Sequence, residues 1–341
     1  MPFMGITIAD IAKAVGVSPT TVSLVLNNKP GASQELREKI LKTANECNYT
    51  VKKKSVKAGS LCFLHIARHG HTVNRDHDVF IADYIEGLSQ AAKIEGYSLE
   101  IMMFKLSPIN TILQSAASSN AEGFIVLGTE LTEEEVLQFK AIDKPFVFID
   151  TYHEFIDFDF VDMNNEESIF MMLKYLFSMG HRNIGFVKAK IETRNIRLRE
   201  MGYLRGLREL GLPENRDFIY SVDQTFHGAY EDMKEILSQH SPLPTALICG
   251  NDIIASGCLR AFSEAGIKIP DELSIVGFDN IPLSSITNPP LTTIQVSKSQ
   301  IGRMAIQLLL TRIRNGKDMP SVKVLIGGKL VTRNSVKQLA I

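Results

Sequence analysis

Apolar residues recur at helical spacing in three short blocks within the first fifty residues of the chain. The first block follows Thr7, a residue type that caps helices, and its apolar positions are Ile8, Ile11, Ala12 and Val15. The second block follows Ser18 and has Pro19 at the first helical position, where a missing N–H costs nothing. Because a short turn containing Gly16 joins these two blocks, the pattern is typical of a helix-turn-helix.

A third block runs from its cap, Ser33, to about Cys47. We expect its apolar side chains to face inward, namely Leu36, Ile40, Leu41 and Ala44. The three blocks predict an all-α headpiece over residues 1–50. The next ten residues, 51–60, are basic and poor in core residues, and we interpret them as a linker.

From residue 61 onward, strand-like apolar runs alternate with amphipathic helical stretches. The predicted strands are 61–67, 99–104, 123–127, 146–149, 184–187, 246–249 and 274–277. The predicted helices are 81–94, 166–179, 199–209, 230–237 and 253–265. Repeated strand–helix–strand units predict an α/β core of parallel sheets with helices on both faces. Because residues 61–341 are many for one doubly wound sheet, we expect two similar lobes.

The net charge becomes informative when it is divided along the chain. The 341 residues together carry −1, which by itself argues against a nucleic-acid binder. Up to Ser60, however, nine Lys and Arg face four Asp and Glu, so this part carries +5 and the remainder −6. A basic module on an acidic body fits nucleic-acid binding, although a +5 surface is also compatible with a solvated face.

Several function classes lack their sequence signals. No apolar run approaches the roughly 20 residues of a membrane helix, and the N-terminus has no secretory pattern, so we expect a cytoplasmic protein without membrane attachment. The four cysteines show no CxxC spacing. His69, His71 and His77 lack matching Cys or carboxylate ligands, and we interpret them as solvated side chains rather than a metal site. Without GxGxxG, GxxxxGK[ST] or GxSxG, we expect neither a cofactor nor enzymatic activity.

Several stretches resemble one known family. Residues 7–18 (TIADIAKAVGVS), with 21–23 (TVS) and 25–27 (VLN), resemble the headpiece of the lactose/galactose-repressor (LacI/GalR) family. Four further stretches resemble that family's core in the expected order, namely LFSMGHRNI at 176–184, TALICGND at 245–252, IVGFDN at 275–280 and PPLTTI at 289–294. The resemblance implies a DNA-binding transcriptional repressor with a two-lobed core (61–341) similar to periplasmic sugar-binding proteins.

The resemblance also implies which headpiece residues contact DNA. Base-reading positions are Pro19, Thr20 and Leu24, and phosphate contacts are expected at Thr7, Ser18, Thr21, Ser23 and Asn27. Short hydroxyls can bond base edges or phosphates, although the same residues can serve only as caps or solvated side chains. The family often has Arg or His where this chain has Leu24, so apolar contact with thymine is expected there.

The linker departs from the family as well. Members usually carry a hinge helix with a Leu wedge, whereas the connection here is about four residues shorter and shows no such wedge. Lys52, Lys53 and Lys54 supply positive charge instead, and we hypothesise that they neutralise phosphates. A merely solvated linker is the alternative.

Polar residues that directly follow predicted strands indicate an effector site. Asp150, Asn251 and Asp279 each follow such a strand, where ligands bind in two-lobed parallel-sheet proteins. By resemblance these residues contact the effector together with Arg199, at the start of a helix, and Phe80, ahead of the first lobe helix. Asn251 and Asp279 can instead be helix or turn caps, and Asp150 a plain loop residue.

The residue types in this site indicate the class of effector. Carboxylates and amides pair with vicinal hydroxyls and Arg forks to ring oxygens or phosphate, so a sugar or sugar phosphate is expected. Arg194 and Arg197 are expected on the surface; turned inward, they would indicate an anionic ligand. The helix-turn-helix predicts a homodimer on a near-palindromic double-stranded operator. Two alternatives stay open, a cytosolic sugar-binding protein and an α/β enzyme without DNA function.

Overall fold

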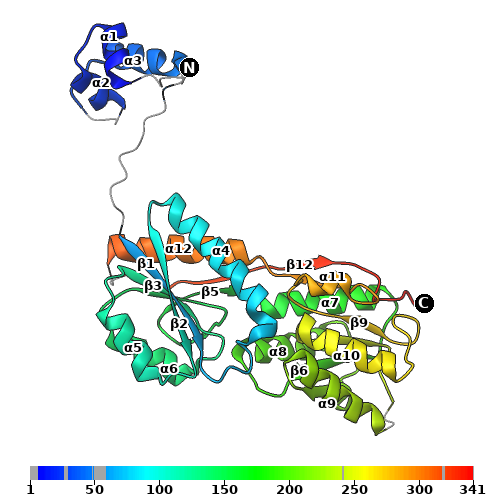
Figure 1. Cartoon of the computed structure of the whole chain (residues 1–341). Coiled ribbons are helices and arrows are strands. Elements are labelled where there is room, and N and C mark those ends of the chain that lie inside the picture. Colours follow the sequence, from blue (N-terminus) through cyan, green and yellow to red (C-terminus); the bar gives the residue numbers. More distant parts are fainter. Residues whose placement is uncertain are drawn as a thin grey trace, which may run out of the picture. The chain divides into compact units, whose positions relative to one another are not determined.

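The computed structural model of the chain describes residues 7–26, 30–47, 49, 59–239, 242–316 and 319–340. The chain divides into two compact units, Met1–Val56 and Lys57–Ile341. The first unit contains three helices, α1 (Ile8–Val15), α2 (Pro19–Leu26) and α3 (Gln34–Glu46) (Figure 1). The three helices expected from the sequence are therefore present, with ends close to the predicted ones.

Local interactions explain where the headpiece helices begin and end. Thr7 and Asp10 form a capping box, in which the Thr7 N–H donates to Asp10 Oδ2 at 2.8 Å and the Asp10 N–H to Thr7 Oγ1 at 3.3 Å. Helix α1 ends at Gly16, whose φ of +78° is a left-handed conformation that glycine adopts without a Cβ clash. The capping box thus fixes the start of α1, and the Gly16 cap fixes its end at the turn toward α2.

The headpiece core lies between its three helices. Its fully buried side chains include Ile11, Val22 and Ile40. Leu41, which was expected to face inward, is 46% exposed, so that prediction is wrong. The inner stripe of α3 follows the i, i+4 spacing of Leu36, Ile40 and Ala44, and Leu41 is rotated about 100° away from it.

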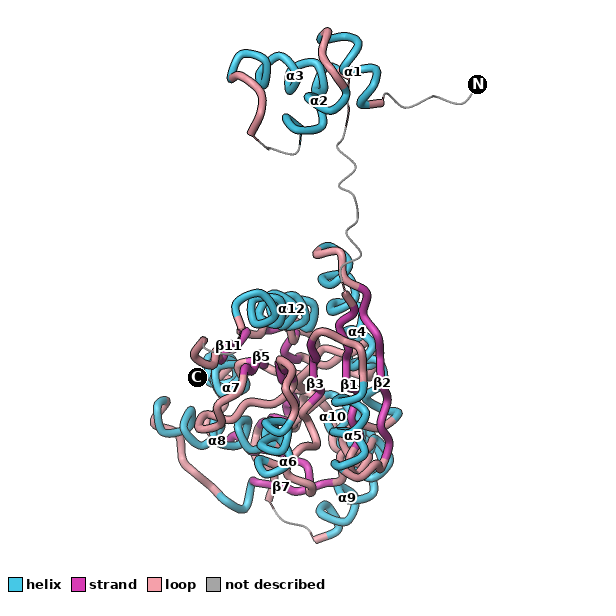
Figure 2. Tube along the Cα trace, turned by 90° about the vertical axis from the view of Figure 1, so that its left-hand side faces the viewer, coloured by secondary structure: helices cyan, strands magenta, loops and turns pink. Residues whose placement is uncertain are grey.

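The first lobe of the second unit is built on a parallel sheet with the strand order β11-β5-β4-β3-β1-β2. Figure 2 shows β3, β1 and β2 side by side. The strands are β1 (Ser60–Ala67), β2 (Ser98–Lys105), β3 (Gly123–Leu127), β4 (Phe146–Ile149), β5 (Asp159–Met163) and β11 (Lys323–Ile326). One face packs on α4 (Asp78–Ile94) and α12 (Lys298–Asn315), and the other on α5 (Ile109–Ser118) and α6 (Glu133–Gln138).

The second lobe is built on a parallel sheet with the order β7-β6-β8-β9. Its strands are β6 (Ile184–Ala189), β7 (Ile219–Val222), β8 (Ala246–Cys249) and β9 (Ser274–Val276). One face packs on α7 (Asn165–Ser178) and α8 (Arg194–Glu209), and the other on α9 (Phe226–Ser238) and α10 (Asp252–Glu264). Helices on both faces of two parallel sheets confirm the predicted doubly wound lobes.

The chain passes between the lobes after β5, before α12 and after β11. Strand β10 (Thr293–Gln295) pairs antiparallel with β12 (Lys329–Val331) beside these crossings. Short helices complete the unit, namely η1 (Arg75–His77), η2 (Phe139–Ala141), η3 (Arg216–Phe218) and α11 (Leu283–Ile286). Within the described residues no single helix is long and apolar enough to cross a bilayer; α1 and α2 meet that test only as a pair bent by 107°.

Candidate functional site

A cavity lies between the two lobes, and all five residues predicted to contact an effector line it: Phe80, Asp150, Arg199, Asn251 and Asp279. The first lobe also contributes Thr72, Val73, His77, Ile81 and Thr129, and the second lobe Thr193, Asn195 and Ile196. The free space among these side chains is about 50 Å³. The two lobes are in contact at this cavity, because the Asn195 amide donates to the Asp150 carbonyl at 3.0 Å.

Two carboxylates of the cavity stand on strained backbone at strand ends. Asp150 directly follows β4 with φ +57°, and Asp279 follows β9 with φ +104°. Positive φ is unfavourable for residues other than glycine and persists where the surrounding structure imposes it, often at functional sites. Asp252 holds the second turn, because its carboxylate accepts the Ile281 N–H at 2.9 Å and the Thr293 hydroxyl at 2.6 Å.

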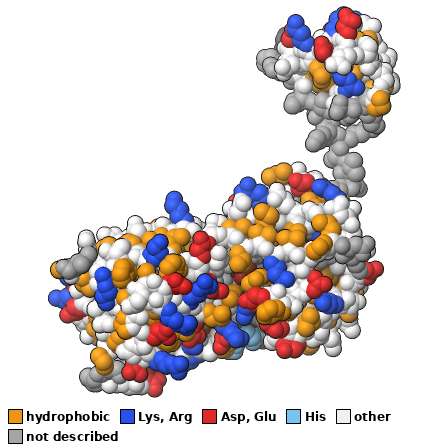
Figure 3. Space-filling view, turned by 180° about the vertical axis from the view of Figure 1, so that it is seen from behind, with side chains coloured by type: hydrophobic (Ala, Val, Ile, Leu, Met, Phe, Trp, Pro, Cys, Tyr) orange, Lys and Arg blue, Asp and Glu red, His pale blue; other side chains and the backbone are white. Residues whose placement is uncertain are grey.

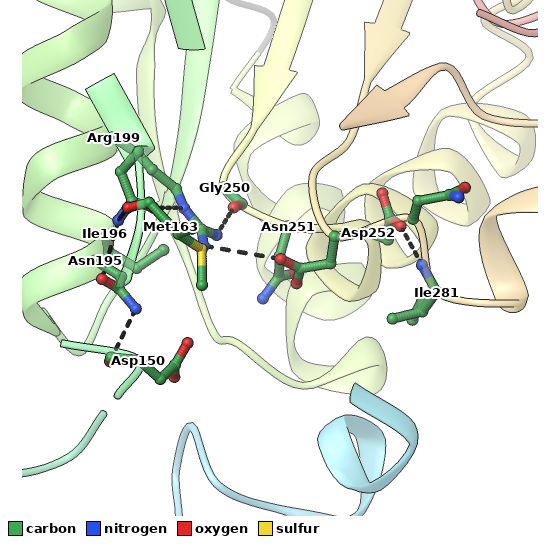
Figure 4. A network of polar contacts seen from close by, with 12 residues as sticks. Asp150, Met163, Asn195, Ile196, Arg199, Gly250, Asn251, Asp252 and Ile281 are labelled. Atoms are coloured by element: carbon green, nitrogen blue, oxygen red, sulfur yellow. Dashed lines mark hydrogen bonds and ion pairs between the residues drawn. The ribbon is translucent and has the colours of Figure 1, made fainter. Parts of the chain in front are cut away.

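Arg199 occupies the centre of the polar network (Figure 4). Its Nε donates to Asn165 Oδ1 at 2.8 Å, and its terminal nitrogens donate to the Gly250 carbonyl at 2.5 Å and Met163 Sδ at 3.1 Å. One terminal nitrogen lies 3.7 Å from Asp279 Oδ1, and the guanidinium lies 3.8 Å from the centre of the Phe278 ring. Arg199 was predicted at the start of a helix, and this is wrong, because α8 begins five residues earlier.

The cavity has more acidic than basic groups. Asp150 accepts hydrogen bonds from the Thr129 hydroxyl and, at 3.3 Å, from the Tyr84 hydroxyl. Burial raises the pKa of Asp150 and that of Asp279 to about 6 each, although Arg199 opposes both shifts. Burial, followed by the charge of Asp150, raises the pKa of Asp162 well above its ordinary value. Two of these acids, Asp150 and Asp279, line the cavity together with the guanidinium of Arg199, whereas Asp162 is not among the lining residues.

Asn251 both caps a helix and reaches across the cleft. Its Oδ1 accepts the Ile254 N–H at 2.8 Å, and its Nδ2 lies 3.1 Å from His77 Nε2 of the other lobe. Asn251 is therefore a helix cap, as the alternative interpretation had it, and it also lines the cavity. His77 is buried rather than solvated, so that interpretation is wrong, and burial lowers the pKa of its imidazole to about 4.

The remaining predicted positions need smaller corrections. Phe80 lies in the first turn of α4, not ahead of it, and its ring packs edge-on against Tyr84 at 5.3 Å. Arg197 is 61% exposed, as expected, whereas only 13% of the Arg194 side chain is exposed. Arg194 instead pairs with Glu154 and donates to the Tyr152 carbonyl at 2.9 Å. Neither arginine lines the cavity.

The sequence reasoning missed Thr72, His77, Thr129 and Asn195 as cavity residues. Thr129 follows the predicted strand 123–127 by two residues, so the strand-end rule would have found it. Asn195 donates to the Asp150 carbonyl at 3.0 Å, an interlobe contact that no local pattern reveals.

Four of the predicted DNA-contacting residues lie at the start of α2, namely Ser18, Pro19, Thr20 and Thr21, whereas Ser23 and Leu24 lie further along it and Thr7 caps α1. Ser18 caps α2, because its Oγ accepts the Thr21 N–H at 3.1 Å. Ser18, Pro19 and Thr20 are exposed, whereas Thr21, Ser23 and Leu24 are half-buried. The hydroxyl of Thr7 donates to Asp10 within the capping box. Asn27, Lys52, Lys53 and Lys54 lie outside the described residues.

Comparisons with known proteins match both units. Residues 7–51 match the family described as bacterial regulatory proteins, lacI family, and residues 173–336 match a periplasmic binding protein-like domain. The HTH-type transcriptional repressor PurR of Pasteurella multocida (strain Pm70) is 32% identical over 334 residues, covering 97% of this chain and 98% of the relative. The PurR repressor of Histophilus somni (strain 129Pt) is 32% identical over 337 residues, covering 98% and 99%.

Solved structures share the fold at lower identity. The lac repressor dimer bound to operator and the anti-inducer ONPF superimposes with a TM-score of 0.72 at 22% identity, covering 98% of this chain and 100% of that one. The complex of the transcriptional regulator CelR with cellobiose gives a TM-score of 0.71 at 20% identity, covering 97% and 99%. These likenesses confirm the predicted fold.

Proposed function

We propose that the effector of this chain, which belongs to the lacI family of bacterial regulatory proteins, is an uncharged polyhydroxylated molecule such as a sugar. The chain is a DNA-binding transcriptional repressor with a small-molecule effector, and dimers on palindromic operators are typical of its family. The sequence predicted either a sugar or a sugar phosphate as the effector. We propose the uncharged sugar and not the phosphate ester.

The contacts that Arg199 already makes with the protein carry this proposal. Its Nε and each terminal nitrogen donate one N–H to a protein acceptor, and its charge faces Asp279 and the Phe278 ring. A phosphate would compete with these protein acceptors and with the carboxylate of Asp279 for the guanidinium, and it would lie beside a second carboxylate of the cavity, Asp150. Asp279 Oδ1 accepts no hydrogen bond within the described part of the chain, so it is open to a hydroxyl donor. The CelR complex with cellobiose is an example of an uncharged sugar bound to this fold.

The proposed effector contacts are the five cavity residues named from the sequence, with Thr72, His77, Thr129 and Asn195 added by the structure. The proposed DNA contacts are Pro19, Thr20 and Leu24 for bases and Thr7, Ser18, Thr21, Ser23, Asn27 and Lys52–Lys54 for phosphates. We further propose that residues 1–50 read DNA, 51–60 connect, and 61–341 bind effector and form the homodimer.

DNA contact through the headpiece fits the charges of the core. In the space-filling view of Figure 3, basic and acidic side chains are intermingled on the face of the core toward the viewer. Such a surface lacks the single-sign field that attracts a polyanion. The relatives are transcriptional repressors, which are not enzymes. We propose that this chain likewise catalyses no reaction and works in the cytoplasm, where operator DNA lies.

A thermal-shift panel of neutral sugars and their phosphate esters tests the effector class. We expect at least one neutral sugar to raise the melting temperature, since a ligand at about 100 times its Kd adds about 2.7 kcal/mol to the unfolding free energy. The matching phosphate ester should give no shift. Asp279→Ala, which removes the acceptor, should abolish the response, and Glu231→Gln, which changes an exposed acid of the same lobe, should retain it. Stabilisation by the esters alone would contradict the proposal.

A further inference from the structure

Glu130 makes an unusual set of contacts next to the effector cavity. It follows the cavity residue Thr129, and its side chain is fully buried. Its Oε2 accepts the N–H groups of His69 and Gly70, both at 3.0 Å, and its Oε1 accepts those of Thr72 and Val73, both at 2.7 Å. One carboxylate therefore holds the loop between β1 and η1 by four backbone hydrogen bonds.

The loop that Glu130 holds leads directly into the contacts between the lobes. Asp76, in η1, accepts the Phe226 N–H at 2.9 Å, at the first residue of α9 in the other lobe. The next residue, His77, lies 3.1 Å from Asn251. The contacts with the second lobe thus begin at Asp76, three residues after Val73, the last residue whose N–H Glu130 accepts.

The same loop forms one wall of the cavity. Thr72 and Val73 line it, and their N–H groups are two of the four that Glu130 accepts. The Thr72 hydroxyl is buried and has no hydrogen-bond partner among the residues that the structure describes. A hydroxyl in this setting remains available to a ligand, and its place depends on the backbone that Glu130 fixes.

We propose that Glu130 is a positioning residue for effector control: its four backbone hydrogen bonds all lie within the first lobe and it is not among the residues that line the effector cavity, yet it sets the loop through which the first lobe closes on the second. A carboxylate is required because its four backbone partners are all N–H donors. Glutamine at this position would direct an NH₂ group at backbone N–H groups 2.7–3.0 Å away. This inference rests on the proposed effector cavity between the lobes.

Hydrogen exchange on the full chain without added ligand tests the inference. In Glu130→Gln, amide exchange at His69, Gly70, Thr72 and Val73 should accelerate about tenfold or more. The Phe226 amide should also accelerate, about fivefold or more, although Glu130 does not contact it. Asp76→Ala should accelerate exchange at the Phe226 amide alone, because it removes only the hydrogen bond between Asp76 and the Phe226 N–H. Glu134→Gln, an exposed acid in the next helix, should change none of these amides.

The Phe226 amide separates the proposal from a purely local role. If the loop loosens in Glu130→Gln while Phe226 exchanges as in the wild type, Glu130 is a loop anchor only and the proposal fails. An unchanged loop also overturns it. Should Glu130→Gln not fold, Glu130→Asp keeps the charge on a shorter side chain and must show the same order of effects. Because no sugar is added, the outcome is independent of the effector panel.

Discussion

Replacing Arg199 by methionine should lower the unfolding free energy of the core by about 3–5 kcal/mol, since one partner of a buried ionic cluster is removed. Asp150, Asp162 and Asp279 would then share a buried site without their guanidinium. Thermal or urea unfolding at pH 8 measures the loss. Arg205→Met is the matched control, because Arg205 lies on the same helix with 72% of its side chain exposed, and it should change stability by less than about 0.5 kcal/mol.

The pH dependence of this variant follows from the two raised pKa values. Asp150 and Asp279 have a pKa of about 6 in the folded core and an ordinary value of 3.8, so the folded state holds more protons between these limits. Ionisation of these two groups therefore lowers the unfolding free energy as the pH rises from about 4 to 6, and it lowers it no further above pH 6. Without Arg199 both pKa values rise further, so the loss continues above pH 6. The gap between wild type and Arg199→Met should be larger at pH 8 than at pH 5; a constant gap would contradict the cluster.

Replacing Ile40 by alanine should strongly weaken operator binding while leaving the core intact. Ile40 is fully buried in the headpiece, and truncating a buried isoleucine costs about 2–5 kcal/mol. A module of about fifty residues has only about 3–5 kcal/mol to lose, so much of the headpiece should unfold. We expect operator affinity to fall more than about tenfold, which corresponds to 1.4 kcal/mol. Fluorescence anisotropy with labelled operator measures this change.

The neighbouring leucine gives a matched control for the headpiece. Leu41 is one residue further along α3 and 46% exposed, so Leu41→Ala should change operator affinity by less than about threefold. Both variants should keep the wild-type response in the thermal-shift panel, because the effector cavity belongs to the other unit. Equal losses of operator binding in the two variants would show that the buried stripe of α3 is wrongly assigned.

Local patterns predicted the elements whose burial is uniform along the chain. Strands such as β3 and β4 are continuous buried apolar runs, and both were found. Strand β5 was missed because Asp159 and Asp162 interrupt its apolar run, although the fold buries both acids. Strands β11 and β12 were also missed, because they are three to four residues long and pair with segments distant in sequence. Helix α12 was not predicted either, although its apolar residues Ile301, Ala305, Ile306 and Leu309 follow ordinary helical spacing and could have indicated it.

The candidate site divides in the same way. Asp150, Asn251 and Asp279 were predicted because parallel strands deliver their next residue to one sheet edge. His77 and Asn195 enter the cavity only because two lobes close on each other, which depends on packing between elements far apart in sequence. The role of Glu130 was equally hidden, since its partners are backbone N–H groups some sixty residues earlier.

We propose that a small neutral molecule in the interlobe cavity changes the affinity of this repressor for its operator. The most direct measurement is the Kd of the full chain for an operator selected from random duplexes, with and without the sugar that raises its melting temperature. Coupling between sites of this kind amounts to about 1–3 kcal/mol, so Kd should change by about 5- to 150-fold in the wild type and stay constant in Asp279→Ala. An unchanged wild-type Kd at saturating sugar, or the full change in Asp279→Ala, would contradict effector control through this cavity.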